Sequence, residues 1–450
     1  MVTTSHETSA AAVKLPPGPP VPRAIQGVVA LANRRVALER LRRRYGSAFS
    51  VNVPIFGRLV VLSDPGEIRE LFMAGTDVAD TIDSSLGRVM GPNSLFALTG
   101  DRYRAHRKLL TPPFHGKQLS AYEAIVEQEA RNEFASWPHD RTFASMPSMT
   151  RITLNVMLRA VVGADGKELD RLREMLPSAI RLGSNLVLIP MPQWDWGRWS
   201  PWGRFRRYRR EYDAIVDVLI DKAHADPDLD QRDDVLALMI RSRYDDDSPM
   251  TRAEIADELI TFLAAGHETT ATTLAWIVER IQRHPALLDR LVADVDAGSD
   301  ELLDATILEV MRTRPAIDST FREVKSPTMQ IGPWTLPKDQ TIIASIGLMN
   351  SDESVFVDAG RFDPDRFLTN PPDSMAFIPY GGGIRRCIGA AFANMEMRIV
   401  IRTLLRNYVI SPSTARDERW QSNRVSITPS RGARVRVQPR VTGAARCSGS

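Results

Sequence analysis

Apolar residues recur at helical spacing along most of this chain, with short strand-like segments before and after the helical part. The first helix is expected over residues 24–45, where an apolar face is accompanied by many arginines. Two short strands should follow, at Ala48–Val53 and 58–62, and the turn residues Pro54 and Gly57 favour their pairing. The chain is therefore expected to begin with a helix and a small sheet.

The middle of the chain is predicted to be mostly helical, from residue 65 to about 244. A loop at about 81–93 and an irregular stretch around 189–203 interrupt this pattern. No repeat, low-complexity run or interdomain linker is evident in the sequence. The pattern predicts a mainly α protein with small β-sheets, of the α+β class. Strand-like segments return later, at 341–344, 425–428 and 433–437.

The composition is that of an ordinary globular protein. We expect a single domain over 23–439, after a flexible proline-rich arm at 1–22 and before a disordered polar tail at 440–450. A net charge of +3 gives no argument for nucleic acid. The two cysteines, Cys387 and Cys447, cannot build a disulfide framework, and no run of 18 apolar residues exists. We therefore expect a soluble protein of the reducing cytoplasm.

One predicted helix is much longer than the others. Thr251 and Glu254 form a capping box at its start, and the pair His284-Pro285 stops it. Its thirty-odd residues span roughly 45–50 Å, enough to cross the whole molecule. Its middle, 264–273, contains one glycine and four threonines, which are poor helix formers. Their hydroxyls can loosen the backbone hydrogen bonds and admit water.

Candidate chemistry is concentrated in the segment 377–389, Phe-Ile-Pro-Tyr-Gly-Gly-Gly-Ile-Arg-Arg-Cys-Ile-Gly. Three glycines allow the backbone to approach a planar ligand closely. Cys387 precedes a helix-like segment, and a helix N-terminus favours a thiolate, which binds metal. The neighbouring arginines suit carboxylates or phosphates. The segment therefore indicates a flat, acidic, metal-bearing ligand; the alternative is a glycine-rich turn with an inert cysteine.

Five residues of this loop match F-G-x-G-x-R-x-C-x-G, the haem-binding pattern of the cytochromes P450. From about residue 15 to 439 the chain resembles a soluble, bacterial-type cytochrome P450, a haem-thiolate monooxygenase. The resemblance implies the P450 fold, in which the long helix crosses haem b. It also implies Cys387 as the axial iron ligand, with Tyr380, which replaces the usual Phe, beside the cofactor. The matching residues are Gly381, Gly383, Arg385, Cys387 and Gly389.

The middle of the long helix, from Ala265 to Thr269, resembles the family's oxygen-activation motif A-G-x-[DE]-T. The resemblance implies that Thr269 and Glu268 deliver protons to dioxygen and help to break the O–O bond. Such work suits a hydrated hydroxyl backed by a carboxylate. His267 takes the variable position of the motif and is expected to be structural or solvent-facing. The alternative is a threonine-rich helix whose small residues only permit close packing.

Haem carries two propionates, and the resemblance implies arginine partners for them. Arg385 is the first candidate, and Arg107 and Arg322 occupy positions that resemble further propionate contacts. Tyr103 stands where the family usually has a tryptophan, and His106 competes with Arg107 for its role. For Arg107 and Arg322 the alternative is a solvated surface charge.

Two further sets of residues are implied by the resemblance. A buried structural clamp would rigidify the backbone near the haem loop and consist of Glu309, Arg312 and Arg366. The substrate walls map to the loop at 83–96, the turn at 425–428 and several mostly apolar residues, which predict a lipophilic substrate without identifying it. These wall residues are Phe96, Phe262, Ala265, Ala316 and Ile317.

Four of the eight tryptophans lie within nine residues, among six arginines between 198 and 210. Aromatic and cationic side chains together suit a membrane interface, so one hypothesis is that this segment touches lipid or receives a lipid-like substrate. The alternative packs the tryptophans into the body of the protein beside a solvated basic helix. The four are Trp194, Trp196, Trp199 and Trp202.

The chain ends soon after Cys387, so no fused reductase is expected, and electrons should come from an external ferredoxin or flavodoxin with its reductase. An acidic partner of this kind would suit a basic face formed by Arg104, Lys108, Lys117 and Arg386. A peroxide-using enzyme and a haem-binding sensor or carrier are the alternatives to an O2-using monooxygenase. The acid–threonine pair favours the monooxygenase, because a carrier needs no proton relay.

Overall fold

The computed structural model describes residues 12–54, 56–82, 85–116, 118–163, 166–188, 193–423 and 426–440. The predicted tail beyond Arg440, with Cys447, and half of the predicted N-terminal arm lie outside these ranges. The chain is mostly helical with small sheets, which confirms the predicted fold class. No helix within the described ranges is both long and apolar enough to span a bilayer.

Internal contacts separate two compact units, which are described one at a time. Unit 1 consists of Met1–Asp83, Asp318–Arg361 and Pro372–Cys387. Unit 2 consists of Ser84–Ile317, Phe362–Pro371 and Ile388–Ser450.

Unit 1 contains a five-stranded sheet with two helices packed on it. Its elements are α1 (Arg23–Tyr45), β1 (Ala48–Val53), β2 (Gly57–Leu62), α2 (Pro65–Met73), β3 (Ala79–Asp80), β5 (Thr320–Val324), β6 (Thr328–Ile331), β7 (Trp334–Pro337), β8 (Thr341–Ala344), α13 (Ile346–Asn350) and the 3-10 turn Gly383–Arg385. The strand order is β1-β2-β8-β5-β3, and β6 and β7 form a separate hairpin. The predicted pair β1 and β2 is antiparallel, and β8 runs parallel to β2.

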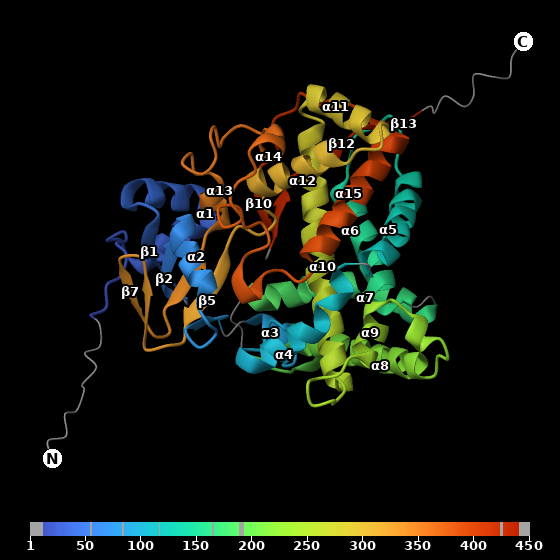
Figure 1. Cartoon of the computed structure of the whole chain (residues 1–450), viewed down its shortest axis with the longest axis horizontal. Coiled ribbons are helices and arrows are strands. Elements are labelled where there is room, and N and C mark those ends of the chain that lie inside the picture. Colours follow the sequence, from blue (N-terminus) through green and yellow to red (C-terminus); the bar gives the residue numbers. More distant parts are fainter. Residues whose placement is uncertain are drawn as a thin grey trace, which may run out of the picture. The chain divides into compact units, whose positions relative to one another are not determined.

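The alternation of side chains along β2 explains why helices cover both faces of this sheet. Val60 and Leu62 share one hydrophobic cluster with Ile68 of α2. Val61, which points to the opposite face, packs with Leu41 of α1. Figure 1 shows α1 and α2 in blue beside these strands.

Unit 2 is a bundle of helices with short β-pairs. Its helices are α3 (Ser85–Met90), α4 (Gly100–Leu110), α5 (Gln118–Ala135), α6 (Met146–Val162), α7 (Lys167–Leu188), α8 (Pro201–His224), α9 (Val235–Arg241), α10 (Arg252–Ile281), α11 (Pro285–Asp296), α12 (Glu301–Thr313), α14 (Asp365–Thr369) and α15 (Ala390–Asn407). Its strands are β4 (Phe143–Ala144), β9 (Tyr408–Ile410), β10 (Trp420–Asn423), β11 (Ser426–Pro429), β12 (Arg434–Val435) and β13 (Val437–Pro439).

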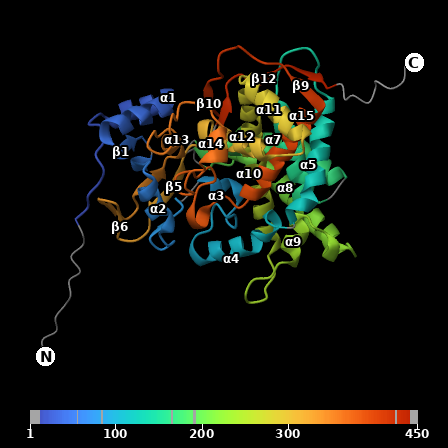
Figure 2. The same ribbon diagram turned by 45° about the horizontal axis from the view of Figure 1, so that its top comes forward.

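The predicted long helix, α10, organises unit 2. It packs against α6, α12 and α15, which lie beside it in Figures 1 and 2. Its capping box forms as predicted, with Glu254 N–H donating to Thr251 Oγ1 at 3.2 Å and Thr251 N–H donating to Glu254 Oε2 at 2.8 Å. Most of its length is buried on all sides, and this packing compensates for the weak helix propensity of its middle.

Three elements differ from the sequence-based expectation. α3 forms inside the predicted loop because Val89 packs with Phe205, a tertiary contact that the local pattern cannot show. α8 begins at Pro201, inside the predicted irregular stretch, since Ser200 caps it. The predicted strand 433–437 is divided between two pairings, β12 with β4 and β13 with β9.

Candidate functional site: a cysteine loop and an accessible stripe on a buried helix

The loop that carries Cys387 is held by backbone hydrogen bonds within unit 1. Cys387 N–H donates to the Tyr380 carbonyl at 3.0 Å, and Gly381 N–H donates to the Ile378 carbonyl at 2.9 Å. The Cys387 side chain is exposed, and α15 begins at Ala390, shortly after it. Burial, with a smaller contribution from the nearby cysteine, raises the pKa of the Tyr380 phenol and keeps it neutral. The loop therefore presents a sulfur donor beside a neutral aromatic ring.

Two of the three glycines are required by a contact that the sequence did not indicate. A Cβ on Gly382 would lie 2.3 Å from the Phe72 ring, and one on Gly383 would lie 2.4 Å from the Phe72 carbonyl oxygen. Gly381 and Gly383 also have φ angles of +67° and +66°, a region that favours glycine. From the sequence all three glycines were expected to face a planar ligand, whereas two of them lie against α2 in the structure.

Arg385 is paired with a carboxylate of the protein itself. Its Nε and Nη2 donate to Asp80 Oδ1 at 2.9 and 2.6 Å, and the two side chains are 8% and 2% exposed. Asp80 ends β3, whose pairing with β5 holds it in place. Sequence reasoning missed Asp80, and no motif or spacing marks it. The pair fixes the guanidinium in a defined place two residues before Cys387.

Arg322 joins strand β5 to the cysteine loop. This buried side chain donates to the Gly382 carbonyl at 3.3 Å and to the Phe321 carbonyl at 2.8 Å. Its guanidinium carbon lies 5.4 Å from the centre of the Phe72 ring, within cation–π range. Arg322 is therefore not the solvated surface charge of the alternative interpretation.

In unit 2, α10 has an accessible stripe in its middle. Over residues 255–281 the helix is buried except at a group that spans less than two turns. Members of this group three or four positions apart lie on neighbouring parts of the helix surface. The residues of the predicted oxygen-activation motif thus coincide with the accessible part of an otherwise buried helix. The group consists of Ala265, Gly266, Glu268 and Thr269.

The threonine hydroxyls of α10 bond to the helix's own carbonyls. Thr269 Oγ1 donates to the Ala265 carbonyl at 2.9 Å, and Thr270 Oγ1 donates to the Gly266 carbonyl at 2.9 Å. α10 continues unbroken through these residues. The loosened backbone expected from the sequence is therefore not seen, and the extra bonds leave the helical hydrogen bonding intact.

Glu268 is held by the hairpin of β10 and β11. Its Oε1 accepts from Ser426 Oγ at 3.2 Å and from Asn423 Nδ2 at 3.5 Å. Residues 424–425, including one end of the predicted wall segment 425–428, lie outside the described ranges. The described part of that segment is thus a hydrogen-bonding partner of the predicted acid as well as a candidate wall.

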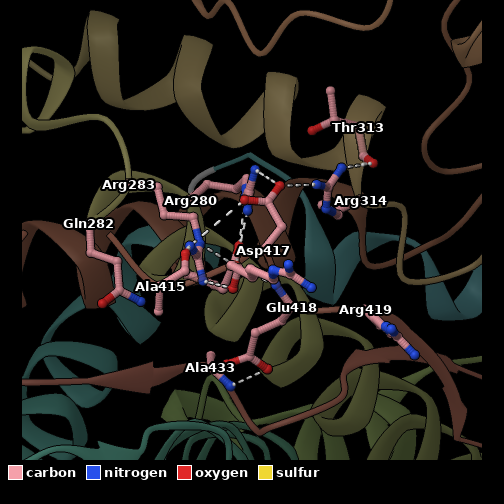
Figure 3. Close-up of polar contacts among 12 residues, drawn as sticks. Arg280, Gln282, Arg283, Thr313, Arg314, Ala415, Asp417, Glu418, Arg419 and Ala433 are labelled. Carbon is pink, nitrogen blue, oxygen red and sulfur yellow. Dashed lines mark hydrogen bonds and ion pairs between the residues drawn. The ribbon is translucent and has the colours of Figure 1, made fainter. Parts of the chain in front are cut away.

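A polar network ties this hairpin to the C-terminal end of α10 (Figure 3). Buried Glu279 accepts from the side chains of Arg280 and Arg283, both at 2.6 Å, and from Glu418 N–H at 3.1 Å. Burial opposes its charge, but the hydrogen bonds from Arg280 lower the pKa of Glu279 overall. The Glu418 carboxylate in turn accepts backbone N–H groups within 431–434. The segment that leads into β10 is therefore anchored on both sides.

His267 and Gly266 serve packing. His267 is 4% exposed, its Nδ1 lies 2.8 Å from the Leu263 carbonyl, and burial lowers its pKa. It is therefore structural, which is one of the two roles expected for it. A Cβ on Gly266 would lie 2.8 Å from the Met157 sulfur of α6. Close packing by small residues and an accessible stripe thus coexist on α10.

α4 carries the predicted propionate helix residues. Arg107 Nη1 donates to Tyr103 OH at 2.8 Å, so these two side chains act together. The ring of His106 is buried and lies 2.8 Å from Tyr244 OH and 3.4 Å from Glu258 Oε1. His106 is engaged by these groups and is not a competitor for the role of Arg107.

The predicted clamp residues are brought together in unit 2. Arg312 Nε and Nη2 donate to the two Glu309 carboxylate oxygens, each at 2.7 Å, and Arg366 Nε lies 3.4 Å from Glu309 Oε2. Asp363 N–H also donates to Glu309, at 2.8 Å. Buried charges are tolerated only with such partners, so the cluster ties α12 firmly to the segment that precedes α14.

Phe262 is the most deeply buried of the predicted wall residues. Its ring packs edge-to-face on Phe114, with ring centres 5.0 Å apart, and its side chain is buried. This aromatic contact fixes the ring, and the place of Phe262 in a substrate wall stays a prediction.

The other predicted wall residues remain accessible. Phe96, Ala265, Ala316 and Ile317 are each half-buried. The Ala316 carbonyl accepts from the N–H of Ile427 in β11 at 2.9 Å, which joins the segment after α12 to the hairpin that holds Glu268.

The predicted basic face is weaker than the sequence indicates. Arg104 Nη2 lies 2.6 Å from Asp101 Oδ1, and Lys108 Nζ lies 2.5 Å from Asp245 Oδ1. Each of these two exposed cations thus has a surface carboxylate within ion-pair distance, and Lys117 lies outside the described ranges. Arg386 is exposed.

Comparison with known proteins identifies the family to which this chain belongs. The Cytochrome P450 family model matches residues 16–436. Cytochrome P450 138 of Mycobacterium tuberculosis is 48% identical over 95% of this chain and 97% of that protein. Cytochrome P450 135B1 of Mycobacterium bovis is 38% identical over 94% of this chain and 91% of that protein. Two solved structures resemble the whole fold: a cyanobacterial P450 bound to retinoic acid and the P450 designated CYP102L1. Each is 22% identical to this chain, with a TM-score of 0.82 over 95% of it. The match covers 100% of the first structure and 99% of the second.

The chain belongs to the cytochrome P450 family. It has the P450 fold, binds haem b and is an oxidoreductase of the haem-thiolate monooxygenase class. It therefore uses O2, a substrate and electrons from a redox partner.

Proposed function

We propose that Cys387 is the axial thiolate ligand of the haem iron. We further propose that Thr269 and Glu268 supply the protons for monooxygenation of a lipophilic small molecule. The observation that carries the proposal is the accessible stripe of α10, because a helix buried over nearly all of residues 255–281 is open at the motif residues. If the threonines served only close helix packing, the helix would not need to be accessible at the motif residues.

The residues around Cys387 fit a haem. The thiol is exposed, and Tyr380 beside it is kept neutral by burial, as suits a residue next to a hydrophobic macrocycle. Arg385 and Arg322 are both held in place next to this loop, as propionate partners should be. For Arg107 of unit 2 the role of a propionate contact rests on the resemblance, and its hydrogen bond to Tyr103 OH holds the guanidinium in place. When bound, the haem supplies iron that reduces dioxygen, and a thiolate ligand donates electron density to it.

Proton delivery is assigned to Glu268 and Thr269 as a pair. Glu268 is half-buried, so it retains access to water, and Ser426 and Asn423 fix its carboxylate. A carboxylate so placed can take protons from solvent and pass them along water to the neighbouring hydroxyl of Thr269. Asn423 and Ser426 therefore act as positioning residues for the acid.

The substrate and the electron donor are assigned by class. The half-buried residues Phe96, Ala265, Ala316 and Ile317 support a lipophilic substrate. We assign electron supply to a separate ferredoxin or flavodoxin with its reductase, in the cytoplasm. Because Arg104 and Lys108 are already paired, we expect weaker electrostatic steering by α4 than the sequence suggests.

Replacement of Thr269 by alanine tests the oxygen-activation assignment. The assay supplies electrons from a ferredoxin and its reductase, with a lipophilic compound that shifts the haem spin state in a titration screen. We expect Thr269→Ala to release severalfold more hydrogen peroxide per electron pair, because protons no longer reach dioxygen in time.

Thr270→Ala is the matched control for this experiment. Thr270 makes the same bond to its own helix, but its side chain is buried and lies outside the accessible stripe. Its variant should keep the wild-type ratio of product to peroxide. Equal ratios for the two variants would refute the role assigned to Thr269.

A further inference from the structure

Three tryptophans stand at the surface of unit 2 just before and in the turn that leads into α8. Trp194, Trp196 and Trp199 are 59%, 65% and 78% exposed. Trp202, by contrast, packs into the body against Phe205. The interpretation in which all four tryptophans are packed inside is therefore wrong for three of them. Indole rings exposed as a group are unusual on a soluble surface and mark an interaction site.

The turn that presents these rings is well defined. Ser200 Oγ accepts from the N–H groups of Trp196 and Gly203, both at 3.0 Å, and donates to the Trp194 carbonyl at 2.9 Å. Gly203 approaches the Gly197 carbonyl so closely that a Cβ would lie 2.0 Å from it. The rings of Trp194 and Trp196 stack with their centres 5.2 Å apart. The segment is therefore locked onto the start of α8 with its indoles facing outward.

The charge around the tryptophans is strongly positive. Residues 194–210 hold six arginines and one acidic residue, Asp195. Arg206 pairs with Asp195 at 3.1 Å, and Arg209 is engaged by Asp257. The guanidinium of Arg198 lies 4.7 Å from the centre of the Trp199 ring. Four of the arginines are exposed to solvent, namely Arg198, Arg204, Arg207 and Arg210.

The packing of α8 indicates on which sides of the helix the exposed arginines lie. Trp202 and Phe205 form a buried cluster with Val89 of α3 and Leu186 of α7. Since Trp202 and Phe205 point to that cluster, the exposed arginines of α8 lie on the other sides of the helix, in contact with solvent. The exposed aromatic and cationic groups thus lie close together along the chain, and Arg198 and Trp199 are in direct contact.

We propose that this surface, residues 194–210, docks on an anionic phospholipid bilayer. Indole rings are amphipathic and settle at the headgroup level of a membrane, where arginines meet lipid phosphates. Both groups occur here together, on a firm turn and with a single carboxylate that is already paired. A lipid surface requires no shape complementarity, which suits three projecting indoles better than a protein groove. The proposal does not depend on the roles assigned to Cys387 or Thr269.

Co-sedimentation with vesicles tests this proposal with the haem-loaded, full-length protein. We expect severalfold more protein to sediment with vesicles that contain phosphatidylglycerol than with pure phosphatidylcholine vesicles. The difference should shrink at high salt, because arginine–phosphate attraction is screened. Tryptophan emission should shift to shorter wavelength on binding, as the indoles leave water.

Variants separate the contribution of the tryptophans to vesicle binding from that of the arginines. Joint replacement of Trp194, Trp196 and Trp199 by alanine should abolish most of the binding and the emission shift. Arg204→Glu and Arg207→Glu should each weaken binding to anionic vesicles severalfold, because charge reversal adds repulsion.

Two controls lie outside this surface. Val357→Ala removes another exposed apolar side chain, 83% exposed, and Arg141→Glu reverses another exposed arginine. Both should bind vesicles like the wild type, and an unchanged haem spectrum verifies that each variant is folded. The proposal is overturned by absence of binding to anionic vesicles, by equal binding to neutral ones, or by a triple tryptophan variant that binds normally. A surface made for a protein partner would give the first of these results.

Discussion

At the scale of single residues, Asp80 is the clearest addition to what motifs indicate. Its carboxylate and the Arg385 guanidinium are both buried, so Asp80→Ala leaves an uncompensated charge and should destabilise the protein by about 3–5 kcal/mol. The variant should also lose haem faster to apomyoglobin, because Arg385 is no longer fixed. Asp77→Ala, an exposed neighbour, should change neither quantity. Haem loss at the wild-type rate in Asp80→Ala would contradict the positioning role.

Glu258 should impart a pH dependence to stability. It is completely buried, and burial raises its pKa to about 7, against the opposing hydrogen bond from His106. Between pH 4.5, the ordinary pKa of a glutamate, and about 7, the folded state therefore keeps a proton that the unfolded chain releases. Stability from this source is complete below that window and is lost as pH rises through it. The ring of His106, which contacts this carboxyl group, also contacts Tyr244 and Glu254. The charge of nearby Asp257 adds to the rise in the pKa of Glu258.

The comparison with Glu258→Gln isolates this effect. The variant cannot ionise at this position, so its Tm should fall less than that of the wild type between pH 5 and pH 8. Glu127→Gln, at an exposed position, should follow the wild-type curve. Parallel curves for wild type and Glu258→Gln in thermal unfolding would show that the buried carboxyl group does not titrate in this range.

The sequence could indicate Cys387, Thr269 and Glu268 because each belongs to a short contiguous motif whose spacing carries the chemistry. It could not indicate Asp80, whose partner lies 305 positions away, since no local signal records such a pair. Phe262 illustrates a contact that the sequence could not show. The resemblance mapped it to a substrate wall, and the structure adds an aromatic partner, Phe114, from a distant turn.

At the scale of elements, the β10–β11 hairpin and α10 form one hydrogen-bonded assembly. Ser426→Ala removes the closer of the two hairpin donors to Glu268, and a hydrogen bond to a charged group contributes about 1.5–3 kcal/mol. We expect slower oxygen activation and a larger kinetic solvent isotope effect, because the acid is less well placed. Both should move toward the values of a Glu268→Gln variant.

Thr428→Ala is the matched control within the same hairpin. Its hydroxyl bonds to the Gln421 carbonyl at 3.4 Å, inside the hairpin, and not to α10. Its variant should leave the isotope effect unchanged. If Ser426→Ala behaves like Thr428→Ala, the hairpin does not position the acid.

Element boundaries were predictable where side-chain caps define them. The start of α10 follows from its capping box. The start of α8 was missed, although its capping residue Ser200 is a signal that the sequence contains. α3 was not predictable, because packing in the cluster with Trp202 decides it. The unbroken middle of α10 likewise depends on packing against α6, as of Gly266 on Met157, which propensity does not record.

At the scale of the whole molecule, the fold class and the family followed from motifs spread along the chain, and the comparisons confirm both. The two compact units were not foreseeable, because each is assembled from segments that are far apart in the sequence. The single domain at 23–439 stays a prediction. The network around Glu279 and Glu418 shows the same limit, since it joins the end of α10 to segments more than a hundred residues later.

The most direct test of the central claim is the absorption spectrum of the reduced, carbon monoxide-bound protein. Thiolate ligation by Cys387 predicts the strongly red-shifted Soret band that is typical of haem-thiolate proteins, in the wild type and in Cys447→Ser. Cys387→Ser should retain little haem or show an unshifted band. A red-shifted band that persists in Cys387→Ser would contradict the assignment of Cys387 as the iron ligand.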